Sequence, residues 1–338
     1  MNKRFLLLRV YPVECIVGIA AAVAAGFYRV LGLPLRQPLN LYMSRLTEAG
    51  ALYLVSLLLI FLFKRLSAIK ASSEEKPPLA DTVRAFAAER LTFERLIHDF
   101  RLLNAVAVMF VVFIQLKHLT PFIRKSLFDE ALLLSEQSMF GGELAGALLA
   151  RSLPTEFAAV LSDAYVLFYP YMAFLILYFI LRSKQSGSTF CTAFALCWFL
   201  GAALIYLVPS WGPCFYRPEL FNHLAPTQMS ELQSDLWKNK LFVESNPNST
   251  EGVFLISGFP SLHVAIPLLG TILLYPFSQA LALASGALTI LTVLSTLYFG
   301  WHYVIDDVGA AFLVFLALVL QRVVDHFLQK ILGRYPLN

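Results

Sequence analysis

The sequence SGFPSLHVA, residues 257–265, opens one long apolar segment of the chain, and the sequence GWHYVIDDVG, residues 300–309, opens another. The first contains His263, and the second contains His302 and Asp306. Ionisable side chains are costly in hydrocarbon and are rare in apolar segments unless they serve a function. Their placement at the ends of two such segments indicates a functional site.

The composition is that of a membrane protein. Of the 338 residues, 58% are hydrophobic and 14% are charged, with a mean hydropathy of +0.69, whereas soluble domains carry roughly 25% charged residues. The formal net charge is +4 and the basic residues are spread through the loops, so we expect no nucleic-acid partner. The four cysteines show no metal-ligand spacing and three fall in apolar segments, so we expect no disulfide framework, no metal and no cofactor.

A membrane-spanning helix needs about 20 mostly apolar residues, and eight segments meet this criterion. They are residues 13–33, 47–66, 102–119, 157–181, 190–209, 261–282, 283–299 and 303–324. The sixth and seventh are nearly continuous, and the sequence around Pro276 supplies the turn between them. We therefore expect an all-α, polytopic membrane bundle of about eight transmembrane helices. We divide it into N-terminal helices in residues 1–156 and a catalytic core in residues 157–338.

The distribution of charge predicts the orientation in the membrane. Lys3 and Arg4 precede the first apolar run, which resembles a secretory signal, but the many spans downstream favour an uncleaved signal-anchor helix. The loop after the second span is rich in basic residues, which predicts that this loop and both termini are cytoplasmic. Residues 210–258 then face outward. Residues 121–156 are too polar to span, and we expect either an amphipathic segment on the outer membrane surface or an ordinary helix packed on the bundle.

The helical topology brings the two histidines together. His263 lies at the start of the sixth span, and His302 lies at the start of the eighth. The chain crosses the membrane in the sixth span and returns in the seventh, so both histidines lie at the same membrane face. Asp306 lies four residues after His302, on the same face of a helix, where its carboxylate is able to take an imidazole N–H and fix the tautomer. On a helix, Asp307 points about 100 degrees away from Asp306. Its presence is explained equally well by helix capping or by solvent exposure.

The neighbouring loop offers groups that suit a phosphate. Arg217 carries a planar fork for phosphate oxygens, and Ser261 stands where free N–H groups begin a helix. Two histidines beside an anion site indicate phosphoryl transfer, in which one attacks phosphorus and the other protonates the departing oxygen. The remaining four histidines lack such neighbours and are interpreted as loop or interfacial residues. Tyr165 and Asp163, near the start of the fourth span, are candidates for lining the cavity, although acids are favoured at helix N-termini in any case.

These residues carry a family resemblance. The sequence FPSLH, residues 259–263, resembles the second signature of the type 2 phosphatidic acid phosphatase superfamily, and Ser295 with His302 and Asp306 resembles the third. The variants PSLHVA and HYVID are most similar to the branch that contains the inositol phosphorylceramide synthases, the aureobasidin-resistance proteins. This resemblance covers roughly residues 209–309. It implies a phosphatase-like core in the C-terminal half and assigns a role to each candidate residue: His302 as nucleophile, Asp306 as its orienting carboxylate, His263 as general acid, and Ser261 and Arg217 as phosphate ligands.

Two departures distinguish this chain from the usual pattern. The third signature usually has an arginine directly after its serine, where this chain has Thr296. The first usually has a lysine seven residues before its arginine, where this chain has Ser210. Two phosphate-binding cations are thus missing, which favours the synthase branch over the plain phosphatases.

The sequence therefore predicts a multi-pass membrane enzyme that transfers a phosphate-containing headgroup from a phospholipid to ceramide or another lipid alcohol. We expect a phosphohistidine intermediate and an active site on the non-cytoplasmic face. The alternative within the same chemistry is a lipid phosphate phosphatase, for which water is the acceptor. A transporter or non-catalytic lipid-binding scaffold is a third possibility, but the centres of the last three spans hold no Lys, Arg, Asp or Glu, which argues against a transport path.

Overall fold

The computed structural model describes residues 10–71 and 77–331, and over these residues the chain is helical with no strands. Lys3 and Arg4, and the acids at positions 74 and 75 of the charged loop, lie outside the described residues. The order of the elements is α2 (Pro12–Leu31), α3 (Pro38–Ala71), α4 (Leu79–Arg90), α5 (Phe93–His118), α6 (Thr120–Ile123), α7 (Asp129–Met139), α8 (Ala145–Ser152), α9 (Phe157–Val166), α10 (Phe168–Arg182), α11 (Lys184–Leu207), α12 (Pro213–Tyr216), η1 (Pro218–Leu220), α13 (Gln228–Ser245), α14 (Leu262–Leu274), α15 (Gln279–Tyr298) and α16 (Val304–Ile331).

Seven helical segments of the described chain are long and apolar enough to cross a membrane, which confirms the predicted all-α, multi-pass class. They are Pro12–Leu31, Pro38–Ala71, Phe93–Ile123, Phe157–Arg182, Lys184–Leu207, Gln279–Tyr298 and Val304–Phe327. The expected span at residues 157–181 consists of two helices, α9 and α10, which meet at Leu167. Pro170 lacks the N–H that would continue the helical hydrogen bonds across this junction.

The sixth expected span, residues 261–282, is wrong in its extent. Helix α14 has only 13 residues, or about 20 Å, against a hydrocarbon core of about 30 Å. The predicted turn is present, but Ser278 caps α15 by accepting a hydrogen bond from Leu281 N–H, so α15 begins at Gln279. α14 and α15 thus pack as a hairpin that returns the chain to the end of the bundle at which α14 begins.

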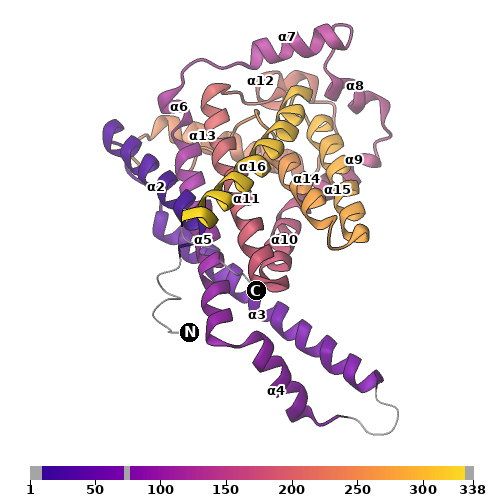
Figure 1. Ribbon diagram of the computed structural model, residues 1–338. Helices are drawn as coiled ribbons and strands as arrows, with labels where there is room; N and C mark the ends of the chain where they lie inside the picture. The colour runs from indigo at the N-terminus through magenta and orange to yellow at the C-terminus, as the bar shows by residue number, and fades with distance from the viewer. Residues whose placement is uncertain (1–9, 72–76, 332–338) are drawn as a thin grey trace.

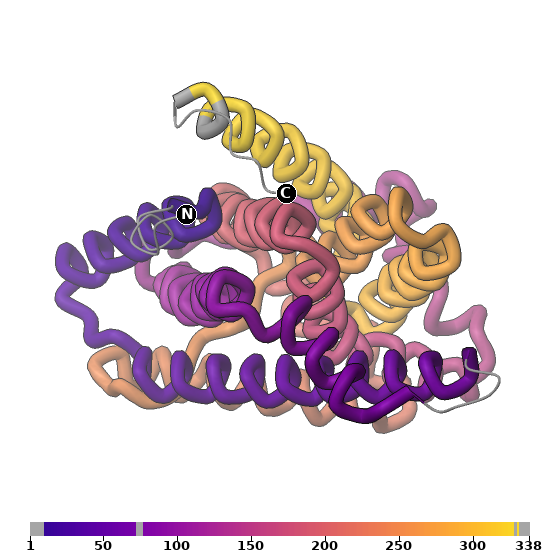
Figure 2. The backbone as a smooth tube through the Cα atoms, turned by 60° about the horizontal axis from the view of Figure 1, so that its bottom comes forward, coloured from indigo at the N-terminus to yellow at the C-terminus, as the bar shows by residue number. Residues whose placement is uncertain are grey.

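Helix α11 is the centre of the bundle. It contacts α2, α5, α10, α14 and α16, and buries residues around its whole circumference, including Phe190, Cys191, Phe194 and Cys197. Figure 2 shows α3 and α16 on opposite sides of this centre. Both carry many exposed apolar side chains, such as Leu59 on α3 and Phe315 on α16, as expected of helices that face lipid.

The short helices lie at the two ends of the bundle. In Figure 1, α7, α8 and α12 gather at the top and α4 lies at the bottom; we call the former the site end and the latter the α4 end. Helix α7 contacts α12 and α16, and α8 contacts α15. Within residues 121–156, α7 and α8 therefore pack on the bundle.

Candidate active site

His302 and Asp306 form a buried pair at the site end. His302 lies in the turn between α15 and α16, and Asp306 lies in the first turn of α16. The His302 Nδ1 is 3.3 Å from Asp306 Oδ2, which also accepts a 2.9 Å hydrogen bond from the Tyr303 N–H. Their side chains are 5% and 0% exposed. When Nδ1–H is donated to the carboxylate, the lone pair of the imidazole lies on Nε2, which makes that nitrogen the nucleophilic one.

His263 lies opposite this pair. It sits in the first turn of α14, and its ring centroid is 6.4 Å from that of His302. The ring stacks on Tyr165 at 4.5 Å and packs on Phe168 at 4.6 Å, and its Nδ1 is 3.4 Å from the Tyr165 hydroxyl. The α14–α15 hairpin brings the two histidines together as the sequence predicts, and Tyr165 lines the site.

Ser261 is fully buried beside the pair. Its N–H donates to the Asp306 carbonyl at 3.1 Å, which joins the start of α14 to the start of α16. Its hydroxyl lies near the Asp307 carboxylate but has no partner in hydrogen-bond geometry within the described chain. A small rotation would let this hydroxyl donate either to the Asp307 carboxylate or to a ligand.

Asp307 also faces inward. Its Oδ2 accepts a 3.4 Å hydrogen bond from Thr296, and its Oδ1 is buried without a hydrogen-bond partner among the residues described. Solvent exposure, one of the explanations offered from the sequence, does not account for this residue. Thr296 stands where the resemblance leads one to expect an arginine, so a carboxylate and a hydroxyl meet here instead.

Arg217 is not brought to the histidine pair. It follows α12, its side chain is 42% exposed, and its guanidinium pairs with Glu219. This pairing raises the pKa of Arg217 and lowers the pKa of Glu219. The structure thus assembles His302, Asp306, His263 and Ser261, and turns Arg217 towards a surface carboxylate.

Two other signature residues hold the backbone of the site together. The Ser210 hydroxyl accepts from Phe259 N–H at 2.9 Å, and the Ser210 carbonyl accepts from Gly258 N–H at 2.7 Å. Ser295 donates to the Leu161 carbonyl at 2.8 Å and so fixes α15 against α9. Gly212 has φ +94°, and a Cβ at this position would collide with the Trp301 carbonyl, so glycine is required where this loop passes His302.

Two buried acids of α7, which were not among the residues predicted from the sequence, complete the site. Asp129 is fully buried and accepts hydrogen bonds from the N–H groups of Trp211 and Gly212, both at 2.9 Å, and from the Tyr303 hydroxyl at 3.3 Å. Glu136 accepts from Ala145 N–H at 2.8 Å and Val304 N–H at 2.7 Å.

Burial raises the pKa of both acids, and the hydrogen bonds from the backbone oppose this shift. The seven-residue spacing of Asp129 and Glu136 places them on one helical face, which is the signal the sequence contained.

Lys117 supplies a positive charge from the N-terminal half of the chain. It lies in the last turn of α5, and its influence on His263 is smaller than that of burial and of His302. No ion pair to Lys117 occurs within the described residues. Lys117 is therefore a candidate cation for the site, in which the usual signature positions hold Ser210 and Thr296.

Comparison with known proteins gives the family. A family model described as the PAP2 superfamily matches residues 133–320, more than half of the chain. The chain belongs to the PAP2 superfamily. Members of this superfamily are generally phosphatases and phosphotransferases that act on phosphoesters. The seven candidate spans in the described part of the chain fit an integral membrane member of this superfamily. The match includes all of the predicted site residues and begins within α7, the helix that carries Glu136. No curated protein and no solved structure matched the chain.

Proposed function

We propose that this PAP2 protein transfers a phosphate-containing headgroup from a phospholipid to a lipid alcohol, in the manner of inositol phosphorylceramide synthase. The observation that carries the proposal is the buried His302–Asp306 pair with His263 facing it at 6.4 Å. This arrangement offers a nucleophile with a fixed tautomer and a separate acid–base group, the two functions that a double displacement at phosphorus needs.

In the first half-reaction, His302 Nε2 attacks the phosphorus of the donor phosphodiester. An N–P bond forms while the bond from phosphorus to the diacylglycerol oxygen breaks. Protonated His263 gives its proton to that oxygen, so diacylglycerol leaves as a neutral alcohol. Asp306 stabilises the positive charge that develops on the His302 ring.

In the second half-reaction, neutral His263 takes the proton of the acceptor hydroxyl. The acceptor oxygen attacks phosphorus, the N–P bond breaks, and His302 returns to its starting state. A ceramide or another lipid alcohol as acceptor yields a new phospholipid, whereas water as acceptor would make the same site a phosphatase.

The oxyanion of the phosphorus centre needs stabilising donors. The unpaired Ser261 hydroxyl and the N–H groups at the start of α14 are placed to supply them. Lys117 adds a positive charge near His263. Arg217 remains a proposed phosphate ligand, and to act as one it has to leave Glu219.

We further propose that the site end faces the non-cytoplasmic side, with both termini in the cytoplasm. The basic loop after α3 supports this orientation. Ser234 is exposed on α13, and the neighbouring Gln233 donates a hydrogen bond to the Phe299 carbonyl at the end of α15, close to His302. A Ser234→Cys variant should therefore react with an impermeant thiol reagent only from outside sealed vesicles. Labelling only from the cytoplasmic side would invert the orientation.

The reaction itself is tested with purified protein and a phospholipid carrying a labelled phosphate. Transfer predicts diacylglycerol and a labelled lipid product that requires the acceptor, and His302→Ala and His263→Ala should each abolish both. His326→Ala, at an exposed histidine of α16, is the matched control and should retain full activity. Release of inorganic phosphate alone would select the phosphatase instead.

A further inference from the structure

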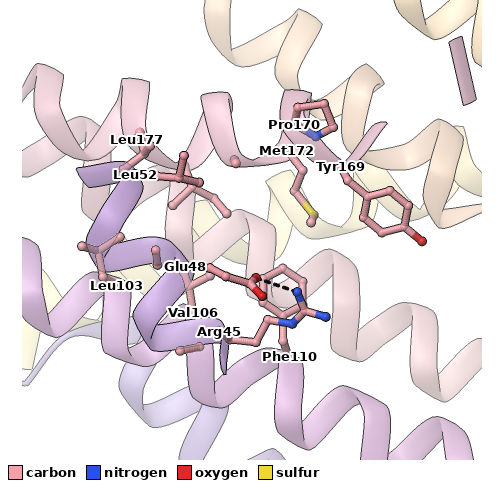
Figure 3. Close-up of a pocket in the computed structure, with 14 residues that line it drawn as sticks. Arg45, Glu48, Leu52, Leu103, Val106, Phe110, Tyr169, Pro170, Met172 and Leu177 are labelled. Atoms are coloured by element: carbon pink, nitrogen blue, oxygen red, sulfur yellow. Dashed lines mark hydrogen bonds and ion pairs between the residues drawn. The ribbon is translucent and has the colours of Figure 1, made fainter. Parts of the chain in front are cut away.

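An apolar groove lies between α3, α5 and α10, next to the histidine pair. Its first part is a cavity of about 270 Å³ with lining residues that include Leu52, Val106, Phe110 and Met172 (Figure 3). A second cavity of about 630 Å³ continues it along α10 towards Arg182. The two cavities share Leu52, Pro170, Ala173 and Leu177, so they form one groove.

The groove is longer than the depth of one leaflet of a bilayer. Its lining on α10 runs from Tyr169 to Arg182, a distance of about 20 Å at the helical rise per residue. The hydrocarbon of a whole bilayer is about 30 Å thick, so the groove exceeds the depth of one leaflet. Its α3 wall belongs to a helix of which only 11% of the membrane window is buried, so the groove is bordered by a helix that faces lipid.

One end of the groove lies one residue from a contact of His263. Phe168 packs on His263, and the next residue, Tyr169, lines the groove. On α5 the lining residues Val106 and Phe110 follow helical spacing, and the same stripe continues seven residues further to Lys117, whose charge acts on His263. The end of the groove at Tyr169 therefore points towards the side of the bundle that holds His263.

The polar groups of the groove are confined to its walls near the two ends. On the α3 wall, Arg45 pairs with Glu48 at 2.8 Å, as Figure 3 shows. At the α4 end the guanidinium of Arg90 donates to the Leu181 carbonyl, and Arg182 lies 4.2 Å from the centroid of the Phe277 ring. Between these ends the lining is almost wholly apolar, which suits hydrocarbon and excludes a headgroup.

We infer that this groove binds one hydrocarbon chain of the lipid substrate and holds its phosphate at the histidine pair. The inference rests on the proposed function and adds the site that positions the lipid. Ala173 lines both cavities, and a larger side chain there would block the groove between them. Ile290, 63% exposed on α15, offers a lipid-facing position for a control.

The test compares Ala173→Phe with Ile290→Phe on phosphatidylinositol with palmitoyl or hexanoyl chains. We expect Ala173→Phe to raise KM for the palmitoyl lipid at least tenfold, since several methylene contacts are lost. Its KM for the hexanoyl lipid should change less than twofold, and Ile290→Phe should match the unmodified protein on both. Equal effects of Ala173→Phe on both lipids, or no effect on either, would overturn the inference. A protein inactive on both lipids before any substitution would refute the proposed function instead.

A crosslinking experiment that does not depend on turnover separates a failure of the groove inference from a failure of the proposed function. A phosphatidylinositol with a diazirine midway along one chain should crosslink to peptides containing Met172 or Leu52, with excess unlabelled lipid competing. Ala173→Phe should lose this crosslink and keep its thermal unfolding midpoint. Crosslinks only to α15 and α16, or crosslinks that excess lipid does not reduce, would overturn the inference.

Discussion

Asp129 is predicted to control catalysis from a helix that contains no proposed catalytic residue. Its carboxylate holds the backbone of Trp211 and Gly212 and the hydroxyl of Tyr303, whose own N–H donates to Asp306. Removing the carboxylate would therefore loosen the loop before α12 and the residue next to His302. The substitution should therefore affect the proposed nucleophile, His302, although Asp129 makes no hydrogen bond to it.

The size of the effect follows from the hydrogen bonds. An unsatisfied buried donor costs about 1–3 kcal/mol, so Asp129→Ala, which leaves two backbone donors without a partner, should cost about 2–6 kcal/mol. Because this is a large share of the stability of a typical domain, Asp129→Asn is the working variant. In this variant the amide oxygen still accepts a hydrogen bond, but the amide NH2 group faces one backbone N–H that then has no acceptor. The free energy of unfolding should fall by about 1–3 kcal/mol.

The assay determines kcat and KM of the variant in detergent, and the midpoint of its thermal unfolding is measured in the same detergent. A displacement of about 1 Å at a reacting group costs up to about a hundredfold in rate, so we expect Asp129→Asn to lower kcat between about tenfold and a hundredfold. KM should change less than threefold. Glu130→Gln, at the exposed acid beside Asp129, is the control and should change neither. A variant that loses stability but keeps kcat would show that Asp129 is structural only.

Four further outcomes are expected. Replacing Lys117 with methionine should raise KM for a phospholipid donor several-fold and leave the fold intact, because no described partner is lost; an unchanged KM would remove Lys117 from the site. Glu219→Gln should release Arg217 for the phosphate and lower KM by up to about fivefold, a small effect because a surface ion pair is weak. Arg217→Gln should raise KM. A higher KM for Glu219→Gln together with a lower KM for Arg217→Gln would exclude Arg217 as a ligand. Burial raises the pKa of Glu136, so the folded protein binds a proton more readily than the unfolded chain and its stability should fall as the pH rises from about 4.3 through the raised pKa. Glu136→Gln should abolish that part of the pH dependence, and an identical pH profile in thermal unfolding would contradict the assignment.

Much of the site was predictable because it depends on local helical geometry. His302 and Asp306 are four residues apart, and the α14–α15 hairpin returns His302 to the side of His263. Both features follow from the rise and period of a helix. The short length of α14 was not predictable from apolarity, since the serine that caps α15 lies inside a nearly continuous apolar run.

The supporting residues depend on contacts between distant parts of the chain. Asp129 and Tyr303 are separated by 174 positions, and no local pattern indicates that an acid between two spans would reach the start of α16. Arg217 pairs with Glu219 because of a turn whose conformation the sequence does not specify. Asp307 faces inward because Thr296 lies beside it, a contact between two helices.

The central claim is that His302 becomes covalently attached to phosphorus, and trapping this adduct tests it most directly. Protein at high concentration would be mixed with a phospholipid carrying radioactive phosphate, without acceptor, and quenched in alkaline detergent, in which an N–P bond survives. We predict label on the peptide that contains His302, lost on acid treatment and absent in His302→Ala. His263→Ala should form the adduct from a nitrophenyl phosphodiester, whose leaving group needs no proton, and should release it slowly. Normal turnover with no adduct at His302, or an equal adduct in His302→Ala, would contradict the mechanism.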